Sequence, residues 1–145
     1  MENQWKWERF ASVTMADSIK TTLATSKPAE IRYFHDKDTS ISMNITDSYT
    51  ARCTTYIYAM SDMNFPCSVC TDDDGRVFCN GTLIGAIKSC AVTAMTLPLK
   101  KGANYIEVYY TEGSGGDGWY FSPKLYERVG YELYAMCATP AVSWS

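Results

Sequence analysis

The sequence predicts an all-β fold, an antiparallel β-sandwich with at most one short helix, and three observations support this. Eleven tyrosines and many Thr, Val and Ile residues favour strands over helices. Short apolar runs are separated by turn signals about every ten residues, the spacing typical of sandwiches. Long helical stripes are lacking. At 145 residues and 46% apolar composition, residues 1–145 are expected to form a single domain.

The strand at 105–110 has the clearest pattern. Ile106, Val108 and Tyr110 alternate with Tyr105 and more polar residues, which places an aliphatic face toward the predicted core. This strand is expected after a short extended piece at 96–99 and a turn at 100–104.

A hairpin is predicted around Asn80-Gly81. Two β-like runs, 76–79 and 82–84, flank this dipeptide, and a type I′ turn needs the positive φ values that Asn and Gly tolerate. Further strands are expected at 31–34, 40–45, 51–60, 119–125 and 131–136, and one short helix at 16–24.

Composition argues against several functions. The net charge is −3 and the 13 basic residues are scattered, so a nucleic-acid-binding face is not expected. No apolar run approaches the ~20 residues of a membrane span, and the first ten residues show no signal peptide. No nucleophile–base set is apparent, and the lone histidine, His35, sits in a charged turn, so we do not expect an enzyme.

Six cysteines include the pair Cys67-Ser68-Val69-Cys70, whose spacing is that of half a zinc site or of a redox motif. A second such pair and a nearby histidine are missing, and no βαβ pattern surrounds it. We therefore expect several of the cysteines to be buried thiols that act as small apolar residues.

The run Asp72-Asp73-Asp74-Gly75 is the densest charge in the chain. Three adjacent carboxylates repel one another, so they are either solvated in a turn or neutralised by a cation, and calcium prefers oxygen ligands of this kind. The spacing is not that of an EF-hand. Both alternatives remain open at this point.

The glycine-rich stretch TEGSGGDG, residues 111–118, is a second candidate site. It lacks the lysine of a Walker loop, and a strand rather than a helix is expected after it, which argues against phosphate binding. Glycines allow close approach of a ligand or ion, Glu112 and Asp117 supply carboxylates, and Trp119 supplies a flat ring. The alternative is a long hairpin whose aromatic residues pack into the core.

Two segments together resemble the PA14 family within the galactose-binding-like jelly rolls. Residues 71–81 are similar to its signature of an aspartate pair, a strand and an Asp-Gly turn, and residues 97–118 are similar to its second signature, which ends in Glu-Gly-Gly-Gly-Gly. Asp74 departs from the usual glycine, and Ser114 and Asp117 interrupt the glycine run. The similarity covers residues 71–121.

The resemblance implies a calcium-assisted carbohydrate-binding module. In sugar-binding members of the family, two aspartates joined by a cis peptide hold a calcium ion that coordinates sugar hydroxyls. Carried over, Asp72 and Asp73 bind the ion, Asp117 or Glu112 completes the ion or sugar contacts, and Trp119 stacks on a sugar ring. The partner would be a cell-surface glycan, bound multivalently.

A second hypothesis is a structural or assembly domain of a particle. In it, Trp5, Trp7 and Trp144 are exposed and contact neighbouring subunits. The alternation Trp5-Lys6-Trp7 places both rings on one face, which suits docking onto a partner as much as packing into the chain's own sheet. Either hypothesis fits an extracellular surface or a virion, such as a bacteriophage tail or fibre, or a domain of a longer chain.

Overall fold

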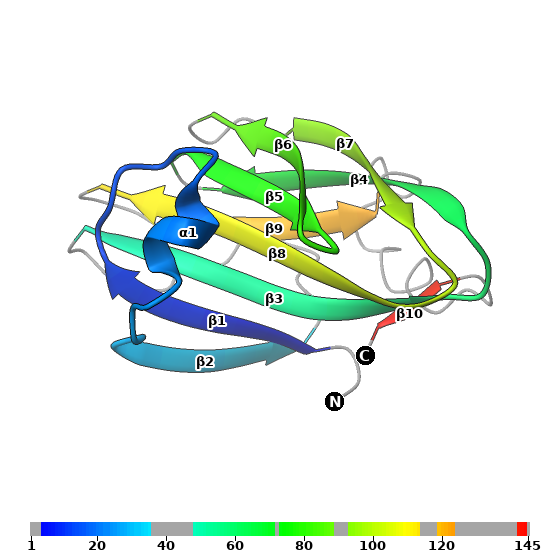
Figure 1. Ribbon diagram of the computed structural model, residues 1–145, viewed down its shortest axis with the longest axis horizontal. Coiled ribbons are helices and arrows are strands. Elements are labelled where there is room, and N and C mark those ends of the chain that lie inside the picture. Colours follow the sequence, from blue (N-terminus) through cyan, green and yellow to red (C-terminus); the bar gives the residue numbers. More distant parts are fainter. Residues whose placement is uncertain are drawn as a thin grey trace.

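The computed structural model describes residues 4–35, 48–71, 73–88, 93–113, 119–123 and 142–144. These residues form two antiparallel sheets that enclose a common core (Figure 1), which confirms the predicted β-sandwich. The larger sheet contains β1 (Gln4–Ala11), β2 (Glu30–His35), β3 (Tyr49–Ala59), β5 (Gly75–Cys79), β6 (Thr82–Ile87), β8 (Gly102–Glu112) and β10 (Val142–Trp144). The smaller sheet contains β4 (Met63–Thr71), β7 (Thr93–Leu99) and β9 (Trp119–Pro123).

The strand order of the larger sheet is β2-β1-β3-β8-β5-β6, and β10 pairs with β3 beyond the end of β1. The order of the smaller sheet is β7-β4-β9. The predicted hairpin between β5 and β6 is confirmed, because Asn80 and Gly81 have φ values of 50° and 85°. The strands expected at 40–45 and 131–136 lie outside the described residues.

The central strand β8 is buried on both faces. Ile106, Val108 and Tyr110 face the core and are fully buried, as the alternation predicts. The opposite face is covered by the helix α1 (Ile19–Leu23), which crosses in front of the sheet in Figure 1. Its apolar side chains join a second cluster made by Phe10, Ile19, Leu23, Phe78 and Tyr109. Within the described ranges no helix is long and apolar enough to cross a membrane.

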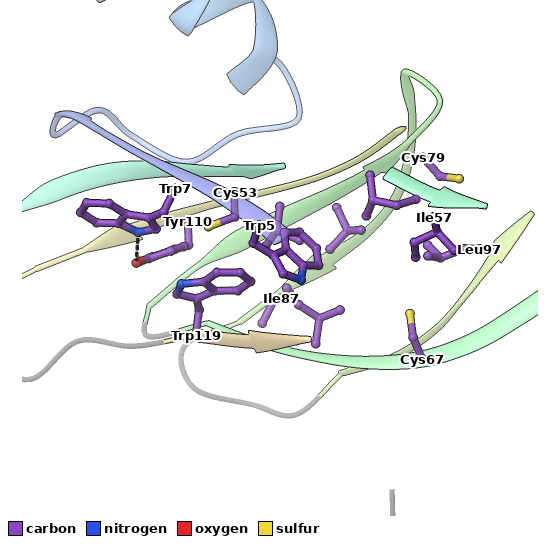
Figure 2. Packing of buried hydrophobic residues seen from close by; sticks show 14 of the residues in the cluster. Trp5, Trp7, Cys53, Ile57, Cys67, Cys79, Ile87, Leu97, Tyr110 and Trp119 are labelled. Carbon is purple, nitrogen blue, oxygen red and sulfur yellow. Dashed lines mark hydrogen bonds between the residues drawn. The ribbon is translucent and has the colours of Figure 1, made fainter. Parts of the chain in front are cut away.

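The structure decides between the two alternatives for Trp5 and Trp7, because both rings pack into the chain's own sheet and the exposure expected of an assembly domain is wrong. Both lie in β1 with 0% exposure and point into the core, where the Trp5 ring meets Trp119 edge-on at 5.1 Å between centroids (Figure 2). The Trp7 indole donates a hydrogen bond of 2.9 Å to the Tyr110 hydroxyl. The alternation placed the two rings on one face, and burial of so much apolar area drives that face inward. The side chain of Trp144 lies outside the described part.

The cysteine pair of the sequence lies in β4, a strand that the sequence did not predict. Cys67 and Cys70 are three residues apart, and side chains of a strand alternate, so the two thiols lie on opposite faces of the sheet. Cys67 points into the core and Cys70 is half-buried. The two cannot share one zinc ion from this strand, and Cys53, Cys67 and Cys79 are buried as expected. Cys90 and Cys137 lie outside the described residues.

Candidate functional site

A cavity of about 650 Å³ opens at one end of the sandwich, where β3 begins and β8 ends. The cavity is shallow and open to solvent, and its lining is mainly polar. Three parts of the chain that are distant in sequence meet there: the segment after β1, the acidic turn between β4 and β5, and the end of β8. The residues that line it are Ser12, Val13, Thr14, Met15, Ser48, Asp73, Asp74, Thr111, Glu112 and Gly113.

The acidic turn is fixed against the end of β8 by two hydrogen bonds. The Gly113 amide donates to Asp73 Oδ2 at 2.6 Å, and the Thr111 amide donates to the Asp74 carbonyl at 3.0 Å. Asp73 adopts a positive φ of 68°, a conformation that Asp and Asn tolerate better than most residues. The Thr71 hydroxyl donates to the Asp73 carbonyl at 2.9 Å and closes the turn.

Gly75 allows this close approach. A Cβ atom at this position would lie 2.8 Å from the Tyr109 carbonyl oxygen and 2.8 Å from Thr71 Oγ1. Because the Tyr109 oxygen belongs to the backbone of β8, it cannot move aside as a flexible side chain would. The turn therefore lies against β8 only because residue 75 is a glycine.

The segment of residues 12–15 forms a further wall of the cavity. The Val13 amide donates to Thr50 Oγ1 at 2.9 Å, and this hydroxyl donates to the Val13 carbonyl at 3.4 Å. Thr50 is fully buried, so the segment is held to β3 by a desolvated contact. The residues of this wall and Ser48 were missed by the sequence analysis, because no local motif marks a contact between positions 37 residues apart.

Of the predicted site residues, Asp73 and Glu112 line this cavity. Asp73 is half-buried, while the Glu112 side chain is almost completely buried. Asp72 and Asp117 lie outside the described residues, and so does the peptide bond between Asp72 and Asp73. Trp119 pairs with Thr71 in the smaller sheet, faces the core and has 0% exposure. Its ring is therefore not accessible for stacking on a sugar, contrary to the prediction from the sequence.

The described cavity lining has acidic character. It includes three acidic residues, Asp73, Asp74 and Glu112, and none of the described lining residues is Lys, Arg or His. The Glu112 side chain is almost completely buried. The nearby cation Arg76 is engaged elsewhere, because its guanidinium donates to Asp17 Oδ1 and to the Gly75 carbonyl, each at 2.8 Å. The acidic residues of the described lining favour a cation or a hydrogen-bonding neutral ligand over an anion.

The described residues do not by themselves complete a metal site. Among them, no group of three or more His, Cys, Asp or Glu side chains is placed to hold a metal ion. A carboxylate can accept the Gly113 amide and still bind an ion, since its two oxygens offer about four acceptor positions. The oxygen donors that line the cavity are of the type that calcium prefers, but further ligands would have to come from residues such as Asp72 and Asp117.

Comparison with known proteins supports the fold. No protein-family model and no curated protein matches the sequence. Among solved structures, the PA14 sugar-binding domain of an RTX adhesin superposes with a TM-score of 0.62 at 12% identity, over 83% of this chain and 89% of that domain. The Epa9 A domain of Candida glabrata, solved with Galβ1-4GlcNAc, gives 0.58 at 9% identity, over 83% and 81%.

A β-glucosidase from Kluyveromyces marxianus, solved with glucose, gives a TM-score of 0.59 at 16% identity. The match covers 81% of this chain but only 15% of the much longer β-glucosidase. At these identities the similarity concerns the fold alone. The chain is therefore an antiparallel all-β sandwich. Its fold is PA14-like.

Proposed function

We propose that this chain is a non-enzymatic carbohydrate-binding module whose ligand occupies the acidic cavity. The observation that carries the proposal is the hydrogen bond between Asp73 and Gly113, which joins the acidic turn to the end of β8 at the rim of a cavity sized for a small ligand. Solved structures with this fold include a domain described as sugar-binding and adhesin domains in complex with galactose-containing disaccharides.

Calcium is the proposed cofactor. Asp72, Asp73 and Asp117 would hold the ion, and Glu112 or Asp117 would complete the ion or sugar contacts. Bound calcium would supply a positive centre that coordinates sugar hydroxyls and relieves the repulsion within the acidic run. The acidic lining of the cavity supports this assignment. The roles of Asp72 and Asp117 as calcium ligands are proposed from the sequence alone.

Proposed partners are a cell-surface glycan and further subunits or domains. One shallow sugar site binds weakly, so a module of this kind gains affinity when several copies are held together. We place the module on an extracellular surface or on a virion, for example in a bacteriophage tail or fibre. This setting rests on the combination of fold and sequence rather than on any described contact.

The experiment that tests the site uses Asp73→Asn. Asparagine keeps an acceptor for the Gly113 amide and tolerates the positive φ of this position, so the substitution removes the charge and leaves the turn intact. Calcium is added first and lactose second, while the melting temperature is followed. A ligand that binds only the native state must raise it. We expect a calcium-dependent rise in the wild type that is lost in Asp73→Asn.

The matched control is Asp62→Asn. Asp62 accepts the Lys101 amide in the turn region at the opposite end of the sandwich, and asparagine can still accept that amide. This variant should respond to calcium as the wild type does. A wild-type melting temperature that neither calcium nor any sugar of a broad glycan panel changes would disprove the proposed function.

A purely structural role in an assembly is the alternative, and one surface favours it. Ile31, Tyr33, Tyr56 and Tyr58 lie on the outer face of the larger sheet, and each is 45–53% exposed. Lys6 of β1 lies between the two residues of β2 and the two of β3. Such a patch suits contact with a neighbouring subunit. Measurement of oligomeric state and sugar binding for the wild type and for Tyr33→Ser would distinguish this role. If Tyr33→Ser changes only the oligomeric state, the structural role is supported. If it changes only sugar binding, the structural role is not supported.

A further inference from the structure

Residues 12–15 line the cavity, and two of them, Ser12 and Thr14, carry hydroxyl groups. Ser12 and Thr14 are exposed, whereas the alternating residues Val13 and Met15 are half-buried and pack against the apolar cluster under α1. The segment is therefore amphipathic over four residues. Val13 and Met15 pack against the apolar cluster, while Ser12 and Thr14 stay accessible to solvent beside the cavity that the acidic turn also lines.

The wall is held rigidly to the same sheet as the acidic turn. Besides the bond between Val13 and Thr50, the following helix is fastened by Lys20, whose ammonium lies 2.9 Å from Glu107 Oε1. The Tyr109 hydroxyl donates to the other oxygen of Glu107 at 2.7 Å. The Glu107 carboxylate is buried, whereas the Lys20 side chain is 37% exposed, so the pair is partly screened by water.

A further ion pair ties the segment to the strand that follows the acidic turn. Asp17, two residues after the wall, accepts Arg76 Nε at 2.8 Å, and Arg76 belongs to β5. The Asp17 side chain is 73% exposed, so this pair is a solvent-accessible link between the segment and β5 that adds to the buried contact with Thr50. Groups fixed before binding lose little conformational freedom when a ligand arrives, which is the condition for selective recognition.

We propose that Ser12 and Thr14 determine which glycan this cavity accepts. They contact the sugar residue next to the one held at the acidic turn. The inference rests on the proposed function and deepens it from a single sugar to a disaccharide or longer glycan. Hydroxyls both donate and accept hydrogen bonds, as sugar hydroxyls do, and they carry no charge, so this wall suits a neutral glycan. The cavity extends from Asp73 to this segment, which leaves room for the second ring.

The test compares the double variant Ser12→Ala, Thr14→Ala with the wild type, using methyl β-galactoside and lactose as probes in calcium-containing buffer. Titration calorimetry measures both affinities. Loss of one neutral hydrogen bond weakens binding by about 2- to 10-fold, so the double variant should bind lactose at least several-fold more weakly. Its affinity for the monosaccharide should stay unchanged, because the contacts at the acidic turn are intact.

Two further variants serve as a negative control and as a test of the support of the wall. Thr22→Ala removes an exposed hydroxyl of α1 that is bonded within its own helix and lies outside the cavity lining, so it should alter neither affinity. Thr50→Val removes the support of Val13 and should weaken lactose binding in the same direction as the double variant. The melting temperature of each variant verifies that it is folded.

The outcomes separate the inference from the proposed function. A wild type that binds neither probe nor any glycan of a broad panel overturns both. If the wild type and the double variant bind lactose equally tightly, only the role of the wall is overturned. Equal weakening for the monosaccharide and lactose also overturns that role, because it would show general damage to the site rather than loss of contacts to a second sugar.

Discussion

Replacement of Trp119 by alanine decides whether this residue is a sugar platform or part of the core. The structure gives its side chain no exposure and an edge-to-face contact with Trp5 at an interplanar angle of 74°. A buried aromatic side chain removes roughly 150–250 Å² from water, worth about 4–6 kcal/mol at ~25 cal/mol per Å². Measured core changes from Trp to Ala cost about 3–5 kcal/mol. We expect the free energy of unfolding to fall by about 4 kcal/mol.

The assay is urea unfolding followed by far-UV circular dichroism, since tryptophan fluorescence changes with the substitution itself. Because domains of this size are stable by roughly 5–15 kcal/mol, Trp119→Ala leaves little stability. Trp119→Phe is therefore measured beside it and should cost roughly 1–2 kcal/mol. Tyr58→Ala, which removes a half-exposed ring from the outer face, is the matched control and should cost about 1 kcal/mol or less.

One combination of results would contradict the buried position of Trp119. If Trp119→Ala leaves the free energy of unfolding within about 1 kcal/mol of the wild type and abolishes sugar binding, the ring is an exposed platform. The packing of Trp5 against Trp119 described above would then be wrong.

Three further predictions concern the core and the acidic turn. Tyr110→Phe should lower the free energy of unfolding by about 1–3 kcal/mol, because it leaves the buried Trp7 indole without its acceptor. Gly75→Ala should cost about 1–3 kcal/mol, because the added methyl group meets the Tyr109 carbonyl of β8. Burial raises the pKa of Cys67 to about 12, so the native state retains a proton that the unfolded chain releases near pH 9, and stability should fall as the pH rises from 9 to 12.

Each of these has a contrasting measurement. Tyr49→Phe removes only the hydroxyl that lies 3.0 Å from Tyr110 and should cost less than Tyr110→Phe. Gly85→Ala brings its methyl group against the flexible end of Met95 and should cost less than Gly75→Ala. Cys67→Ala should lose stability less steeply than the wild type above pH 9. If the two variants of either pair lower the free energy of unfolding equally, the contact assigned to Tyr110 or Gly75 is contradicted. If the wild type and Cys67→Ala lose stability with the same slope above pH 9, the burial effect on Cys67 is contradicted.

Local chemistry explains which parts of the fold were predictable. The hairpin at Asn80-Gly81 depends on two adjacent residues that tolerate positive φ, and the buried face of β8 depends on alternation within one strand. The direction in which Trp5 and Trp7 point does not follow from alternation, because the pattern gives a shared face but not its orientation. β4 was missed because it contains Pro66, a residue that argues against a strand in the sequence, and because its cysteines resemble a metal-binding motif.

The candidate site was predictable in part. The similarity to PA14 signatures placed the acidic turn near the end of β8, and Asp73 does lie against Gly113. The orientation of Trp119 depends on its pairing with Thr71 across the smaller sheet, and the wall at residues 12–15 depends on Thr50. Both are contacts between distant positions that no local motif records.

The position of β10 has a consequence for how the cavity is presented. β3 starts at the cavity and runs away from it for 11 residues, a distance of roughly 30 Å. β10 pairs with its far end, at Ile57–Ala59, and β1 also begins toward that end (Figure 1). A scaffold joined to this protein through either strand would therefore hold it by the end remote from the cavity. Copies mounted side by side would point their cavities outward together, toward a facing surface.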